Sequence, residues 1–217
     1  MTTLVRPDVP PRPEKIMIVG DLHGGFAALN YRVAAQSPSL ILQCGDFGYW
    51  PGQGMRLPKT GFRDRAGTVV PLHFCDGNHE NHPKLLELAQ KGEFGIGWGI
   101  FYQPRGSVLT LPDGRTVLFA GGAASIDKDA RVPGVDWFTE EVLTEQAFRT
   151  HFPVMDRVDI VISHTAPESV ALPLILDTTF YDPSRAVLEA VLRKYKPSLW
   201  FCGHFHPTLT VILRFFT

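Results

Sequence analysis

The sequence predicts an α/β fold with a mixed β-sheet, on the strength of three observations. Short apolar runs, typical of buried strands, recur along the 217-residue chain, and several of them end in glycine. Stretches with apolar residues at helical spacing lie between some of these runs. Near the middle, Pro112-Asp113-Gly114 separates two β-rich runs, which is a strong signal for an antiparallel hairpin. Strand–helix repeats favour parallel pairing, so the hairpin makes the predicted sheet mixed.

The first half of the chain is expected to begin with a leader and then to alternate strands and helices. Residues 1–14 are rich in proline and predict a flexible leader, and residues 15–217 predict a single domain. The expected strands are 16–19, 40–44 and 69–75, and the expected helices are 24–36 and a second one ending near residue 91. Residues 47–67 carry repeated glycine and proline, and a segment of this length and composition is usually functional or mobile.

The second half begins with the hairpin and continues with a polar loop at 123–137. Asp182-Pro183 is a typical helix start, with an N-cap followed by proline at the first helical position. The expected strands are 106–111, 115–120, 159–163, 199–203 and 209–216, and the expected helices are 140–148 and 183–195. The last strand is a long apolar edge, and such an edge invites pairing with a second subunit, so a homodimer is one expected assembly.

Composition limits the kind of partner. The formal net charge is −1 and no block of like charges occurs, which argues against a long nucleic acid, because binding to a phosphate backbone needs clustered Lys and Arg. Three cysteines without CxxC spacing suit a reduced compartment. The sequence shows neither a signal-peptide pattern nor an 18-residue apolar span. We therefore expect a cytoplasmic protein without a membrane partner.

Metal-binding side chains follow five of the expected strands. Carboxyl ends of strands are where α/β proteins place ligand sites, and glycine at a strand exit lets the backbone turn tightly. The residues at these exits are Asp21, His23, Asp46, Asn78, His79, His164, His204 and His206. In extended backbone, residues i and i+2 face the same way, so Asp21 and His23 can converge. Oxygen and imidazole ligands without thiolate suit Mn²⁺, Fe or Zn²⁺.

The order of these motifs carries more information than any one of them. The chain contains Gly-Asp-Leu-His-Gly, Gly-Asp-Phe-Gly, Gly-Asn-His-Glu, Ser-His-Thr-Ala-Pro and Gly-His-Phe-His, in that order, between about residues 16 and 207. It closely resembles the calcineurin-like metallophosphoesterase superfamily. The resemblance implies a four-layer α/β/β/α sandwich of two mixed β-sheets flanked by helices.

The resemblance also implies a role for each ligand. Two divalent ions are expected, with Mn²⁺ first and Fe or Zn²⁺ as alternatives, and Asp46 would bridge them. One ion would be held by Asp21, His23, Asp46 and His206, and the other by Asp46, Asn78, His164 and His204. His79 would lie beside the substrate as the catalytic residue that protonates the leaving oxygen. The implied reaction is in-line attack on phosphorus by a metal-bridging hydroxide.

Three further residues are candidates for substrate binding. Tyr49 and Trp50 directly follow the Asp46 block and could form an aromatic wall, or they could pack in the core. Arg131 lies in the charged 123–137 loop, which could be a solvated face or could bring the guanidinium onto a phosphate. Glu80 is expected to cap the following helix or to orient its neighbours.

Four functions remain open at this point. The first is hydrolysis of small-molecule or nucleotide-like phosphoesters. The alternative is a Ser/Thr-type phosphoprotein phosphatase, but that branch places Asp-Arg-Gly soon after the bridging aspartate, whereas Asp46 is followed by Phe47-Gly48-Tyr49. A nuclease and a catalytically retired protein-interaction scaffold are the further alternatives. The scaffold is disfavoured because the chain keeps every expected ligand.

Overall fold

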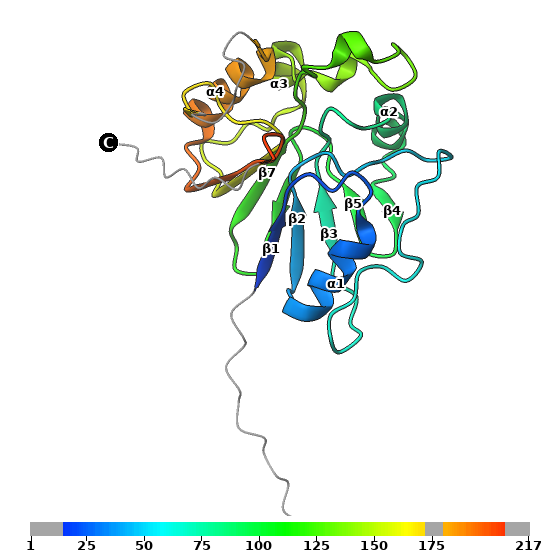
Figure 1. Cartoon of the computed structure of the whole chain (residues 1–217). Coiled ribbons are helices and arrows are strands. Elements are labelled where there is room, and N and C mark those ends of the chain that lie inside the picture. Colours follow the sequence, from blue (N-terminus) through cyan, green and yellow to red (C-terminus); the bar gives the residue numbers. More distant parts are fainter. Residues whose placement is uncertain (1–14, 172–179, 207–217) are drawn as a thin grey trace, which may run out of the picture.

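Two β-sheets face each other in the computed structural model, which describes residues 15–171 and 180–206, and helices cover their outer faces (Figure 1). The first sheet has the strand order β1-β2-β3-β5-β4. Its strands are β1 (Ile16–Val19), β2 (Leu40–Gln43), β3 (Leu72–Phe74), β4 (Gly95–Gly97) and β5 (Ile100–Tyr102). All neighbouring pairs are parallel except β4 with β5, so this sheet is mixed.

The second sheet has the order β6-β7-β8-β9. Its strands are β6 (Val108–Thr110), β7 (Thr116–Ala120), β8 (Ile160–Ser163) and β9 (Leu199–Phe201). The antiparallel β6–β7 pair is the hairpin that the sequence predicted around Pro112-Asp113-Gly114. The pairs β7–β8 and β8–β9 are parallel, which confirms the prediction of mixed sheets.

Four α-helices are present in the described ranges, with two 3-10 turns between the hairpin and α3. Their bounds are α1 (Phe26–Gln36), α2 (His82–Lys91), η1 (Lys128–Ala130), η2 (Thr139–Glu141), α3 (Glu145–His151) and α4 (Pro183–Tyr195). The Asp182 side chain accepts a hydrogen bond from the backbone N–H of Ser184, as expected for the N-cap of α4. None of the helices in these ranges is both long and apolar enough to cross a membrane.

Alternation of side chains along the strands explains the layers. In β2, Ile41 packs with α1 and α2, while Leu40 and Leu42 point into the core between the two sheets. In β8, Val161 packs against α4, while its two neighbours in the strand belong to that same central core. The result is a layer of α1 and α2, the first sheet, the second sheet, and a layer of α3 and α4. The predicted four-layer arrangement is confirmed.

Several boundaries differ from the sequence-based expectation. Strands β4 and β5 were not predicted, because Gly95, Gly97 and Gly99 give this segment a turn-like composition. Helix α3 begins at Glu145 instead of residue 140, since the Thr144 side chain accepts from the N–H of Ala147 and the preceding residues form a 3-10 turn. The expected leader at 1–14 and the edge strand at 209–216 lie outside the described residues.

A buried ion pair ties the two sheets together by linking the segment after β3 to the segment before β6. The Arg105 guanidinium donates two hydrogen bonds to Asp76 Oδ2, at 2.9 and 2.6 Å, and others to the carbonyls of Glu140, Glu141 and Val142. Burial raises the pKa of Asp76, but the charge and hydrogen bonds of Arg105, together with the His82 charge, hold that pKa below its usual value. Asp76 follows β3, and Arg105 leads into β6, so this pair fixes how the sheets meet.

Arg105→Ala is expected to lower the free energy of unfolding by about 3–5 kcal/mol, because it leaves the fully buried Asp76 carboxylate without its charge partner. Urea unfolding followed by circular dichroism would measure the change. The control is Arg149→Ala, which breaks an exposed pair with Glu145 and should change stability little. Equal stability of the Arg105→Ala variant and the wild type would contradict the assigned role.

Candidate metal centre

The predicted ligands lie on loops that leave the carboxyl ends of five strands, at one edge of the sandwich. The loops after β1, β2 and β3 of the first sheet contain Asp21, His23, Asp46, Asn78 and His79. Strands β8 and β9 of the second sheet carry His164, His204 and His206. The centre is therefore assembled across the two sheets.

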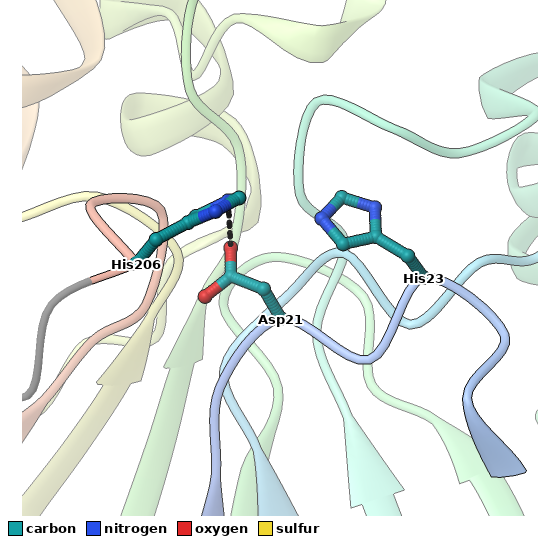
Figure 2. A group of neighbouring side chains, drawn as sticks. All are labelled: Asp21, His23 and His206. Atoms are coloured by element: carbon teal, nitrogen blue, oxygen red, sulfur yellow. Dashed lines mark ion pairs between the residues drawn. The ribbon is translucent and has the colours of Figure 1, made fainter.

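Asp21, His23 and His206 form one group, with one ligand atom of each lying within 4.8 Å of the others. Figure 2 shows the two imidazoles on either side of the Asp21 carboxylate, whose Oδ1 is 3.9 Å from His206 Nε2. The Asp21 carboxylate also accepts the backbone N–H of His204, at 2.9 and 3.0 Å. The side chains of His23 and His206 are 38% and 70% exposed, so this group is open to solvent.

A second, buried group contains Asp21, Asp46 and His164. The two carboxylate oxygens of Asp46 face in different directions: Oδ2 is 3.5 Å from His23 Nε2, and Oδ1 is 3.4 Å from His164 Nε2. Asp46 thus belongs to the buried group and also faces His23 of the exposed group, while Asp21 belongs to both groups. The His204 ring lies beside this buried group, 4.8 Å from the His164 ring between centroids.

The donor set around His164 suits a cation. Its Nδ1 donates to the carbonyl of Cys44 at 2.8 Å, so Nε2 is the nitrogen that faces the site. Nε2 lies 2.9 Å from Asn78 Oδ1 and close to Asp46, so acceptor oxygens surround it. Burial lowers the pKa of His164, but the charge and hydrogen bond of Asp46, the Asp21 charge and the bond to Cys44 together raise it to about 10. Carboxylate, amide oxygen and imidazole are a donor set that divalent Mn, Fe or Zn accepts.

Four of the predicted ligands adopt left-handed backbone conformations. Among the described residues, the non-glycine φ angles include 44° at His23, 53° at Asp46, 71° at His204 and 58° at His206. Such angles are sparsely populated and cluster at functional sites. The loops hold them with backbone bonds, since the Asp46 carbonyl accepts the N–H groups of Leu22 and His23. Asp21 and His23 therefore meet through a turn, and the extended backbone expected from the sequence is wrong here.

The glycines at the strand exits make room for ligands from other strands. A Cβ on Gly77 would overlap the Asp46 carboxylate, and one on Gly45 would overlap the His164 ring. A Cβ on Gly203 would lie 2.7 Å from Asp21 Oδ2. Glycine is thus required by close approach at these exits, in addition to any turn.

His79 lies outside both ligand groups and contacts a charged loop. Its backbone N–H donates to Asp46 Oδ1 at 2.8 Å, and its Nε2 is 2.6 Å from Arg131 Nη2. Arg131 can only donate, so His79 Nε2 accepts. The pKa of His79 is lowered by burial and also by the charges of Arg131 and His23. The Arg131 side chain is 8% exposed and pairs with Asp127 at 2.8 Å. Through Arg131 the 123–137 loop reaches His79.

A cavity of about 450 Å³ opens beside His23 and His79. Trp50 forms part of its wall, and its indole N–H donates to the His79 carbonyl at 2.9 Å, which fixes the ring. Tyr49 is 7% exposed and packs in the core around α1, so it is placed away from the cavity. Arg56 also lines the cavity and was not among the residues predicted from the sequence. The sequence signal for Arg56 was its place in the Gly/Pro-rich 47–67 segment. Such a composition indicates a functional loop but not which of its residues acts.

Glu80 joins the loops after β2 and β3, since its carboxylate accepts the N–H groups of Gly48 and Gly77, each at 3.1 Å. Burial and the nearby Asp46 charge raise its pKa to about 8. These contacts orient its neighbours, which is one of the two roles expected from the sequence. The other, capping α2, belongs to Asn81.

The family model described as calcineurin-like phosphoesterase matches residues 14–208, which include every ligand named above. No curated protein matches the chain.

Proposed function

Because the chain belongs to the calcineurin-like phosphoesterase family and is therefore a metal-dependent phosphoester hydrolase, we propose that it binds two divalent ions and hydrolyses small-molecule or nucleotide-like phosphoesters. The observation that carries the proposal is the position of Asp46. Its Oδ2 faces His23 in the exposed group, and its Oδ1 faces His164 in the buried group. A carboxylate placed in this way is suited to bridge two ions about 3.5–4 Å apart.

The proposed ligand sets are those that the family resemblance implies. Asp21, His23 and His206 form the exposed group, and Asp46 and His164 lie in the buried one. The exposed ion would be held by Asp21, His23, Asp46 and His206, and the buried ion by Asp46, Asn78, His164 and His204. When bound, such ions polarise the phosphoryl oxygens and make water nucleophilic near neutral pH. We expect Mn²⁺ to support activity in vitro, with Fe or Zn²⁺ as the alternatives.

Two residues outside the ligand sets would act on the substrate. His79 lies beside His23, with ring centroids 4.9 Å apart, and borders the cavity, so it can pass a proton to the leaving oxygen. Arg131 donates to His79 Nε2 and to the Asn78 carbonyl. A guanidinium in this position can hold a non-bridging phosphoryl oxygen and orient the His79 ring.

The cavity favours a small substrate. Its volume of about 450 Å³ falls within the usual range for small-molecule sites. The Trp50 ring in its wall could stack against a nucleobase or an aryl group. A phosphoprotein phosphatase is the alternative, because Arg131 could supply the phosphate-binding arginine that is missing after Asp46.

The test is hydrolysis of a substrate panel by purified protein with Mn²⁺. The panel would contain bis-p-nitrophenyl phosphate, p-nitrophenyl phosphate, cyclic nucleotides and phosphopeptides. We expect turnover of the small esters and none of the phosphopeptides. Phosphopeptide turnover with inert small esters would favour the phosphatase alternative. Inactivity on the whole panel with every metal would favour the scaffold.

Trp50→Ala is expected to raise KM for a nucleotide-like ester roughly tenfold, because base–aromatic stacking contributes about 1–3 kcal/mol. The kcat value should change less than KM, since Trp50 bonds to the backbone carbonyl of His79 and not to its imidazole, and touches neither ligand group. Trp50→Phe keeps a ring and should recover most of the loss, and Tyr31→Ala is a control at an exposed aromatic on α1. Unchanged KM values across the panel would remove Trp50 from the substrate site.

A further inference from the structure

The side-chain amide of Asn78 has a defined orientation. Its Nδ2 donates to Ser125 Oγ at 3.0 Å, and its Oδ1 faces His164 Nε2 at 2.9 Å. The Ser125 hydroxyl donates in turn to Glu141 Oε2 at 2.8 Å. A carboxylate only accepts, so the Ser125 proton is committed to Glu141, and its lone pairs are left for the Asn78 NH₂ group. The reverse amide orientation would set the oxygen of Asn78 against an oxygen of Ser125.

Glu141 is itself held in place from several sides. Its Oε1 accepts the Ser125 backbone N–H at 2.7 Å and the Trp137 indole N–H at 3.0 Å. Its carbonyl accepts from Arg105 Nη2 at 2.9 Å. Ser125 and Glu141 are each 1% exposed, so water does not compete for these bonds.

These contacts close a ring around the loop after β3. Arg105 pairs with Asp76, which is two residues before Asn78, and it also binds the Glu141 carbonyl. The Glu141 side chain reaches Asn78 through Ser125. The backbone of the Asn78 loop and the Asn78 amide are thus both held by the same 3-10 turn, η2. Such a ring positions an amide more firmly than one hydrogen bond would.

We propose that Ser125 and Glu141 are positioning residues that hold the Asn78 amide oxygen toward the metal centre and so set the affinity of the buried ion site. The inference rests on the proposed function where it makes Asn78 a ligand. Partners that orient metal ligands typically change metal affinity by about 10–100-fold when they are removed. The exposed site, with Asp21, His23 and His206, has no contact with Ser125 among the hydrogen bonds of the described residues.

The test is calorimetric titration of metal-stripped, full-length protein with Mn²⁺. In Ser125→Ala we expect one of the two binding events to weaken by about 10–100-fold and the other to stay as in the wild type. At saturating Mn²⁺ most of the kcat should return, since no catalytic group is lost. Trp137→Phe is the matched control, because it removes a different donor to Glu141 and leaves the Ser125–Asn78 bond in place.

A double-mutant cycle with Asn78→Asp distinguishes positioning from general destabilisation. A carboxylate has two equivalent oxygens and needs no orientation, so Ser125→Ala should change Mn²⁺ affinity little in the Asn78→Asp background. Glu141→Gln tests the same contact if Ser125→Ala fails to fold. Mn²⁺ binding in Ser125→Ala equal to the wild type, or equal weakening of both events, would overturn the inference alone. A wild type that binds no divalent ion would instead overturn the proposed function.

Discussion

Asp46→Asn is expected to reduce kcat by about 10³-fold and to lower the amount of metal bound, because a lost ligand charge at a metal centre is worth several kcal/mol of transition-state stabilisation. Asn has the shape of Asp but replaces one oxygen by an NH₂ donor. That change removes an acceptor from either the His23 side or the His164 side of the carboxylate. Asn also tolerates left-handed backbone, and the φ of Asp46 is 53°, so the loop should keep its conformation.

Steady-state kinetics and metal analysis of the purified Asp46→Asn protein would measure both effects. Asp159→Asn is the control, since Asp159 accepts hydrogen bonds from Thr116 at the amino ends of β7 and β8. The ligands lie at the opposite, carboxyl ends of the strands. The control should keep its metal content and its kcat. An Asp46→Asn variant with normal activity and two bound ions would show that Asp46 does not bridge them.

His79→Ala is expected to reduce kcat by about 10²–10⁴-fold while the metal content stays unchanged. His79 lies outside both ligand groups, so the ions should remain when its imidazole is removed. The loss should be larger for an ester of an alkyl alcohol than for a p-nitrophenyl ester, because p-nitrophenolate can leave without a proton. Kinetics with the two leaving groups would measure this difference.

His151→Ala is the control for this experiment, because His151 is an exposed histidine at the end of α3. An equal loss for both leaving groups would assign His79 to phosphate binding instead of proton transfer. Loss of metal from the His79→Ala protein would show that the imidazole itself helps to hold the ions. In that case the backbone N–H bond from residue 79 to Asp46, which the variant keeps, would not be enough.

Much of the fold could be predicted because its signals are local. The hairpin at Pro112-Asp113-Gly114 and the helix start at Asp182-Pro183 each depend on a few adjacent residues, and both are confirmed. Strand β4 could not be predicted, since a strand of Gly-Ile-Gly is held by pairing with β5 and has little propensity of its own. The late start of α3 could not be predicted either, because it depends on which of several polar residues forms the N-cap.

The candidate site, like the fold, could be predicted only in part. The ligands could be predicted because each follows an apolar strand-like run, and the carboxyl ends of strands are where α/β proteins place ligand sites. The partners of those ligands were not visible. Ser125 contacts Asn78 across 47 positions of sequence, and no local pattern indicates such a contact. Tyr49 packs in the core, whereas its neighbour Trp50 lines the cavity. The sequence of two adjacent aromatic residues could not show which of them would do so.

The assembly of the centre from both sheets links metal binding to the folding of the whole chain. The first sheet comes from residues 16–102 and the second from residues 108–201, so the ligands are drawn from the two halves of the sequence. An ion held by Asp46 and His164, as proposed, would act as a non-covalent cross-link between those halves. Each tenfold rise in free metal above the dissociation constant should then add about 1.4 kcal/mol to the free energy of unfolding, for each ion that binds only the folded state. The metal concentration in the cell would therefore set how long the folded chain persists, as well as how fast it works.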